Sequence, residues 1–203
     1  MYRKFENLID PFVRLEEGTP PAKLWPYIKT QIAPYRKWMV WMAITGLMVA
    51  LMETGLIFYS GRVIDLMAQS TPQSFWPTHG TELVFAILFI LFLRPLVIVL
   101  NHLFLEQTLA SNLQEQVRWR AHKHMLGQSV TFFQNDFAGR LSNRVMQMGQ
   151  AVEDAVYMFF EAIWYAAVYI IGAMVLLGQV HPLLALPLAV WAIFYVLYVR
   201  YIA

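Results

Sequence analysis

Long apolar runs dominate the pattern of hydrophobic and polar positions along the chain. A hydrocarbon core of roughly 30 Å needs about 20 helical residues to be crossed, and four runs reach this length. The pattern therefore predicts four membrane-spanning helices, at about residues 38–59, 83–105, 156–177 and 182–201.

The composition excludes most other classes of protein. Apolar residues make up 59% of the chain and charged residues 14%, against roughly 45–50% and about 25% in soluble domains. The absence of cysteine excludes a disulfide-stapled scaffold. A net charge of +2 gives no reason to expect a nucleic-acid partner. The fold class predicted is an all-α integral membrane protein in contact with lipid.

Lysine and arginine are strongly biased to one side of the predicted spans. Residues 1–37 carry seven of them and residues 106–150 carry five, whereas the connector 60–82 carries only Arg62. Because loops rich in these residues stay in the cytoplasm, the N-terminus and the second connection are both predicted to be cytoplasmic. Arg200 fits the same orientation, near the inner surface.

The tail that precedes the first span contains a short amphipathic pattern. Within residues 1–37, apolar side chains recur at helical spacing beside lysines and arginines; they are Leu24, Trp25, Ile28, Ile32 and Tyr35. This pattern predicts an elbow helix that lies in the inner headgroup layer. An ordinary juxtamembrane anchor is the alternative. Residues 38–203 then form the membrane domain.

The connection between the second and third spans does not have the pattern of a loop. Apolar residues repeat every four positions from Leu105 to Met125, and a second stripe includes Leu141 and Val152. These stripes continue the two spans as helical rods of about 64 and 60 Å. Residues 106–155 are therefore predicted to form a long cytoplasmic hairpin.

The tip of this hairpin carries aromatic residues where water is expected. Phe132, Phe133 and Phe137 all lie between Gln128 and Ala138. Exposed aromatic clusters usually mark a surface that a protein partner buries. The alternative is that they cap the small core of the hairpin itself.

The same stretch resembles the membrane domain of ABC exporters. The segment from Arg120 to Val145 carries that family's aromatic pair, then Gly139, and Arg144 five residues later. The sequence Gly61-Arg-Val-Ile-Asp65 is similar to the family pattern Gly-Arg-Ile-Ile-Asp at the outer surface. The resemblance covers about residues 25–203. One departure is Met148, where the family commonly has aspartate.

The resemblance implies a coupling helix that docks on a cytoplasmic ATPase domain. By position, the coupling helix would comprise Val130, Thr131, Phe132, Phe133, Gln134, Asn135 and Asp136. The family also implies export from a bacterial inner membrane, and a homo- or heterodimer.

The chain lacks the sequence features of an ATPase. No Gly-Lys pair of a P-loop occurs in it. The resemblance to ABC exporters implies that ATP and Mg²⁺ are bound by a nucleotide-binding domain outside these residues. The chain is expected to be the N-terminal part of a half-transporter with no enzymatic activity of its own. A four-span scaffold, or an unrelated membrane enzyme or sensor, is the alternative.

A few polar side chains fall within the predicted spans. Because a charge at mid-bilayer costs roughly 2.5–3.5 kcal/mol, Glu53 and Arg94 are expected to form an ion pair between the first two spans or to line the substrate pathway. Glu161 and Trp164 are three residues apart, and they could bind a cationic substrate or simply pack. No metal site is predicted, because His122 and His124 are spaced too poorly to share an ion.

Overall fold

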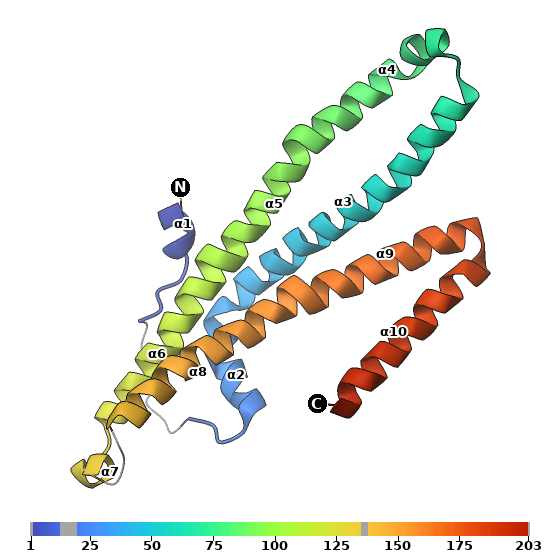
Figure 1. The fold of residues 1–203 in the computed structure, drawn as a ribbon. Helices are drawn as coiled ribbons and strands as arrows, with labels where there is room; N and C mark the ends of the chain where they lie inside the picture. Colours follow the sequence, from blue (N-terminus) through green and yellow to red (C-terminus); the bar gives the residue numbers. More distant parts are fainter. Residues whose placement is uncertain (1, 13–19, 135–137, 203) are drawn as a thin grey trace. The chain divides into compact units, whose positions relative to one another are not determined.

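The computed structural model describes residues 2–12, 20–134 and 138–202, and all regular structure within them is helical (Figure 1). Short helices precede the first long one: α1 (Tyr2–Glu6), α2 (Leu24–Ile32) and the 3₁₀ turn η1 (Ala33–Tyr35). The remaining elements are α3 (Arg36–Gln69), α4 (Pro72–Leu88), η2 (Phe89–Leu93), α5 (Arg94–His102), η3 (Leu103–Ala110), α6 (Ser111–Leu126), α7 (Val130–Gln134), α8 (Ala138–Met158), η4 (Phe159–Trp164), α9 (Tyr165–Val180) and α10 (Pro182–Ile202).

Several of these elements follow one another without a break and form long rods. In the described residues, four such rods are long and apolar enough to cross a membrane: Leu24–Gln69, Ser74–Leu126, Gly139–Val180 and Pro182–Ile202. The predicted all-α membrane fold is confirmed. The second rod contains 53 residues, which corresponds to roughly 80 Å at 1.5 Å per residue.

Local sequence explains where the rods are interrupted. Thr71 precedes α4 and forms a capping box with Ser74, while Pro72 occupies the first turn, where its missing N–H costs nothing. Pro182 begins α10 in the same way, after an extended His181. Within the second rod, the π-helical segment η2 ends just before Arg94 and Pro95. Pro95 cannot make a regular helical hydrogen bond, and the wider turn accommodates it.

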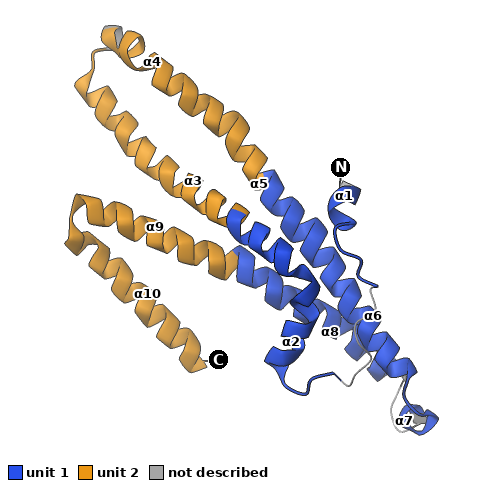
Figure 2. Cartoon of the chain, turned by 180° about the vertical axis from the view of Figure 1, so that it is seen from behind, with its two compact units in different colours: residues 1–44, 99–161 blue, residues 45–98, 162–203 orange. Residues whose placement is uncertain are grey.

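The chain divides into two compact units (Figure 2). Unit 1 comprises residues 1–44 and 99–161. Apolar side chains from its helices and from the N-terminal segment form one buried cluster: Ile9, Tyr35, Met42, Leu105, Leu109, Leu113, Val117, Val152, Val156 and Phe160. These residues include the stripe that the sequence predicted along the second rod.

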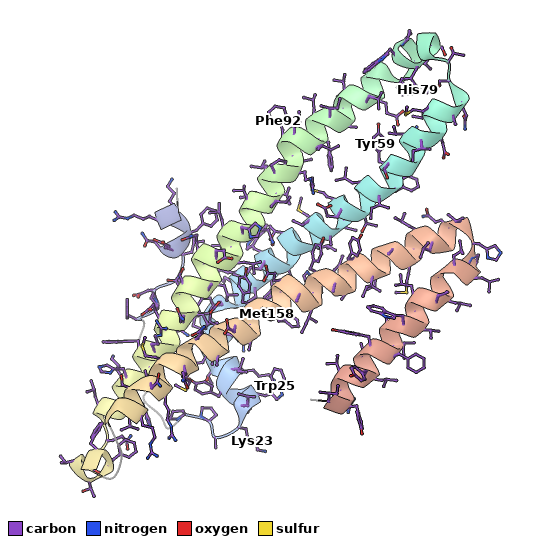
Figure 3. All side chains as sticks on the ribbon, viewed as in Figure 1. Lys23, Trp25, Tyr59, His79, Phe92 and Met158 are labelled. Atoms are coloured by element: carbon purple, nitrogen blue, oxygen red, sulfur yellow. The ribbon has the colours of Figure 1, made fainter. Side chains whose placement is uncertain are left out.

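Unit 2 comprises residues 45–98 and 162–203. Its buried side chains are few and mostly small: Thr45, Ala50, Thr54 and Val97. Large apolar side chains such as Phe92 point away from the helices (Figure 3). Such an apolar exterior is what a lipid environment requires.

Candidate functional site

The hairpin, formed by α6, α7 and α8, carries the predicted docking tip. α7 begins after Ser129, whose carbonyl and hydroxyl oxygens accept hydrogen bonds from the Phe132 N–H at 3.0 and 3.4 Å. The Phe132 and Phe133 rings meet edge to face at 5.4 Å, and each side chain is about 40% exposed. The structure thus places both aromatic rings at the tip, where a partner could reach them.

The structure describes α7 as far as Gln134. Asn135, Asp136 and Phe137, which belong to the predicted coupling helix and tip, lie outside the described residues. Val130 is 73% exposed at the start of α7. Gly139 and Arg144 both lie on exposed positions of α8. Their assignment as family motif residues rests on the sequence alone.

A groove of about 540 Å³ runs between α6 and α8 and ends at the tip. Its lining is mostly apolar, and Phe133 contributes from α7. The other lining residues are Phe12, Glu115, Arg118, Trp119, His122, Met125, Leu126, Leu141, Ser142, Val145 and Met146. Phe133 thus faces this groove and is 39% exposed.

The two long arms of the hairpin approach closely at one glycine. A Cβ atom on Gly149 of α8 would lie 2.7 Å from Arg118 Cγ and 3.0 Å from the Gln114 carbonyl oxygen of α6. Only a residue without a side chain allows this approach. Leu113 and Val117 are fully buried on the facing helix. The close crossing makes α6 and α8 one stiff element.

Polar side chains fasten α2 to the same hairpin. Gln116, which is 1% exposed, donates from Nε2 to the Gln31 carbonyl oxygen at 2.8 Å. Arg120 donates to Gln31 Oε1 at 2.6 Å and to the Thr30 carbonyl oxygen at 3.4 Å. Sequence patterns had not revealed this network, because it depends on which helices meet.

Burial also shifts the ionisation of the groups at this junction. It raises the pKa of the Tyr35 phenol well above its ordinary value, an effect that the nearby Arg120 charge only partly offsets. It lowers the pKa of the Arg120 guanidinium. Met148, which stands where the family commonly has aspartate, accepts a hydrogen bond at Sδ from the Tyr27 hydroxyl at 3.7 Å. At this position the α2–hairpin contact is thus formed without a carboxylate.

Within unit 2, Glu53 and Arg94 come together as an ion pair. Arg94 Nε and Nη2 both reach Glu53 Oε1, at 2.9 and 2.7 Å. The Glu53 side chain is 27% exposed and the Arg94 side chain is 37% exposed. The pair joins α3 to α5, so each charge is compensated where a hydrocarbon environment would penalise it alone.

Glu161 and Trp164 lie on the π-helical segment η4. The wider turns of such a segment change the angular spacing of side chains, so the α-helical relation between residues three apart does not hold there. Glu161 is exposed and Trp164 is half-buried. No three His, Asp or Glu side chains gather to hold a metal ion anywhere in the part of the chain that the structure describes.

At the opposite end of unit 2, the Gly61–Asp65 motif forms part of α3 rather than of a loop. Its Arg62 binds Glu82 of α4, with Nε 2.7 Å from Oε1 and Nη2 3.4 Å from Oε2. The hydrogen bond from Arg62 lowers the pKa of the Glu82 carboxyl below its ordinary value. This pair joins α3 to α4 near the turn between them.

Comparison with known proteins gives two matches to transporters. Residues 39–203 match the family described as the ABC transporter transmembrane region. A protein of Haemophilus influenzae, named "Uncharacterized ABC transporter ATP-binding protein", is 32% identical over 198 residues. That alignment covers 97% of this chain and 32% of the relative, so the chain spans about a third of the relative's length. No solved structure matches the chain significantly. The family match covers most of the chain, which therefore belongs to the ABC transporter transmembrane region family.

Proposed function

We propose that this chain forms the permease part of an ATP-driven exporter and that α7 is its coupling helix. The hairpin lies in the cytoplasm, together with the N-terminus, because twelve of the fifteen lysines and arginines of the chain fall in residues 1–37 and 106–150. ATP and Mg²⁺ are bound by a nucleotide-binding domain, fused or separate, whose movement the hairpin passes to the spans.

The observation that carries this proposal is the pair of exposed rings on a stiff support. Phe132 and Phe133 stand at the tip of two arms that cross closely at Gly149. Two aromatic side chains that stay about 40% exposed are the type of anchor that protein interfaces bury. A rigid lever ending in such an anchor transmits displacement, whereas a flexible loop would absorb it.

Substituting the two rings tests the docking role. In the transporter that contains this chain, Phe132→Ala with Phe133→Ala is expected to lower ATP-driven transport by about 30-fold, the effect of removing an interface anchor worth about 2 kcal/mol. Val180→Ala removes an even more exposed apolar side chain, 77% exposed, at the end of α9 and is the control. Unchanged transport in the double variant would reject the docking role.

Crosslinking provides an independent test, since the chain contains no cysteine. A cysteine at Phe133 is expected to crosslink to a cysteine in the cleft of the nucleotide-binding domain, whereas one at Val180 is not. Crosslinks that form only with lipid-soluble reagents would place the tip in the membrane and contradict the orientation.

The Glu53–Arg94 pair serves as a structural bond between the first two spans in this proposal. The geometry supports this role, because two nitrogens of the Arg94 guanidinium in α5 reach one carboxylate oxygen of Glu53 in α3. A residue on the substrate pathway would instead change which substrates are carried. Arg94→Leu is therefore expected to lower the amount of folded transporter while leaving its substrate range unchanged.

Dimerisation and a bacterial inner membrane complete the proposal. Large apolar side chains of α10 such as Trp191, Phe194 and Tyr201 are more than half exposed. Lipid covers part of that surface, and further helices of the same transporter or its partner subunit cover the rest. Crosslinking of single-cysteine variants along α10 in membranes checks this assignment by separating protein-facing from lipid-facing positions.

A further inference from the structure

The N-terminal segment, residues 2–12, lies along the second rod in unit 1 (Figures 1 and 2). Its first helix, α1, packs beside η3. The Phe5 ring meets Phe104 edge to face at 5.4 Å, and Ile9 is only 8% exposed in the buried cluster. Seven residues further along the chain from Phe5, the Phe12 ring meets Trp119 at 5.5 Å. The segment is therefore a packed element of the hairpin body.

Hydrogen bonds hold the main chain of the segment in place. Thr108 donates from Oγ1 to the Phe5 carbonyl oxygen at 3.2 Å, and Asn112 donates from Nδ2 to the Glu6 carbonyl oxygen at 2.9 Å. Both donor side chains are buried, at 0% and 8% exposure. The carbonyl groups at the end of a short helix lack partners within it. The Phe5 carbonyl oxygen also accepts a hydrogen bond from the Leu8 N–H at 3.4 Å, and the two side chains add bonds from the second rod.

The segment packs against an irregular stretch of the second rod. η3 (Leu103–Ala110) is π-helical, and such segments often mark functional positions in a helix because their hydrogen bonding is irregular. Side chains that follow it bond its carbonyl groups: Ser111 Oγ to Glu106 at 3.1 Å, and Asn112 Nδ2 to Thr108 at 3.2 Å. Asn112 thus contacts both the irregular turn and the N-terminal segment.

A bend at η3 would separate the two ends of the lever. Leu105 and Leu109, which lie in the π-helical segment, belong to the same buried cluster as Ile9. The Asp10 carboxylate also accepts a hydrogen bond from the Phe12 N–H at 2.9 Å, which turns the chain toward Trp119. The contacts of the segment begin at Phe104, the second residue of η3, and extend beyond η3 to Trp119 of α6, so the segment spans most of the irregular stretch, as a splint must.

We propose that residues 2–12 act as a splint across η3, keeping the second rod from bending there so that movement of the hairpin reaches the membrane spans. This inference rests on the proposed coupling function, because it assigns a regulator to that lever. Released from its contacts, the segment would leave the rod free to flex, and ATP hydrolysis would continue with less transport per ATP.

Removing the two donors tests the splint in the complete transporter. Thr108→Val with Asn112→Leu keeps the side chains close in size while deleting both hydrogen bonds to the segment. Asn112→Leu also deletes the bonds from Asn112 to the Gln107 and Thr108 carbonyl oxygens of η3, so a control that disturbs η3 alone is needed. Hydrogen–deuterium exchange of the backbone amides in 103–110, measured in lipid nanodiscs, is expected to become at least about tenfold faster. Transport per ATP hydrolysed is expected to fall. Ser111→Ala, which removes a bond to η3 but none to the segment, is the matched control.

A covalent crosslink between the N-terminal segment and α6 should reverse the effect. Cysteines placed at Phe12 and Trp119 of the double variant, joined by a short bismaleimide, are expected to restore slow exchange in 103–110 and efficient transport. Deleting residues 2–12 is the second variant should the double substitution fail to fold, and the same exchange increase is expected. Unchanged exchange and unchanged transport per ATP, in a folded variant, would overturn the splint.

The exchange measurement separates this inference from the proposed function. Protection of 103–110 depends on contacts inside unit 1, so it is measured without any nucleotide-binding domain docking at Phe133. Loss of docking with intact protection would reject the coupling role alone. Fast exchange in the native protein, equal to that of the variant, would reject the splint alone.

Discussion

The two compact units are stabilised by different means. Unit 1 buries an apolar cluster and surrounds it with hydrogen bonds from fully buried polar side chains such as Gln116 and Thr108. Unit 2 buries few side chains, and two ion pairs among its described residues, Glu53 with Arg94 and Arg62 with Glu82, each join one helix to another. Unit 1 therefore resembles a water-soluble domain, whereas unit 2 depends on its environment to cover its apolar surface.

This difference indicates that the two units would contribute differently to movement in the proposed transporter. The proposed coupling function requires a stiff lever, and the close packing of the apolar cluster in unit 1 favours stiffness. A membrane portion that changes conformation must let its helices separate, and a few ion pairs are easier to rearrange than a packed core. The predictions below compare matched residues in the two units, in order of decreasing effect.

The largest effect is expected where helices touch at glycine. Gly149→Leu in unit 1 inserts four carbons against Arg118 Cγ and the Gln114 carbonyl oxygen, and the backbone of α6 cannot move aside cheaply. A destabilisation of about 3 kcal/mol is expected, measured by unfolding the purified transporter in mixed micelles. If the hairpin acts as the proposed lever, transport should fall as well, since the hairpin loses its stiffness.

Gly172 is the corresponding contact in unit 2. A Cβ there would lie 2.9 Å from Thr54 Oγ1 and 3.0 Å from Thr54 Cγ2, which belong to one side chain, whereas a Cβ on Gly149 also meets a main-chain oxygen. Gly172→Ala is therefore expected to cost less than Gly149→Ala. Gly61→Ala, with no atom within 4 Å, is the control, and it should be neutral or stabilising by up to about 1 kcal/mol through helix propensity. Equal costs at both contacts would contradict a stiffer unit 1.

The second prediction concerns the intramembrane ion pair. Arg94→Leu leaves the Glu53 carboxylate without its partner and is expected to cost about 2–3 kcal/mol, whereas removing both charges with Glu53→Gln should recover most of that loss. A double-mutant cycle in the same unfolding assay measures the coupling. Additive effects of the two substitutions would show that the pair contributes nothing to unit 2.

Much of this fold could be predicted from hydrophobic periodicity and charge. The apolar runs predict the four spans, and the stripe through Leu109, Leu113 and Val117 predicts the continuous second rod, because these signals are local in sequence. The aromatic pair at the hairpin tip is likewise visible as apolar residues in a polar turn. The coupling role of that turn was predicted only from the resemblance to a family, and it stays a prediction.

The rest of the site depends on tertiary contacts that no local pattern reveals. Residues 2–12 were predicted only as part of the cytoplasmic N-terminal tail, yet Ile9 and Phe5 pack against a helix about a hundred positions away. Glutamine side chains are usually exposed to solvent, yet Gln31 and Gln116 are both buried where α2 meets α6, and Gln116 donates a hydrogen bond to the Gln31 carbonyl oxygen there. The π-helical segments and the crossing at Gly149 follow from packing as well.

The third prediction tests the polar junction between α2 and the hairpin. Gln116→Leu leaves the buried Gln31 carbonyl oxygen without its donor and is expected to cost about 1–2 kcal/mol. Gln114, two residues earlier on the same helix, is only half-buried, so Gln114→Leu provides the comparison and should cost less. Mixed-micelle unfolding again measures the difference, and an equal cost at both positions would mean that the junction adds no stability.

The smallest effect is expected at the exposed pair of Arg62 and Glu82. The hydrogen bond from Arg62 lowers the pKa of the Glu82 carboxyl, so the folded protein favours the charged form more than the unfolded chain does. The stabilisation is therefore complete above the ordinary carboxyl value of 4.5 and is lost as the pH falls through the lowered pKa. Both groups are exposed, so salt at about 1 M should screen the pair.

Glu115 provides the matched carboxylate in unit 1, because it pairs with Arg118 at 3.0 Å within a single helix. Glu82→Gln should lower the melting temperature at pH 7 more than Glu115→Gln does, since only Glu82 joins two helices. The difference should disappear in acid and in high salt. A Glu82 effect that persists under both conditions would require a contact other than charge at that end of α3, and the contrast between a packed unit 1 and an ion-paired unit 2 would then weaken.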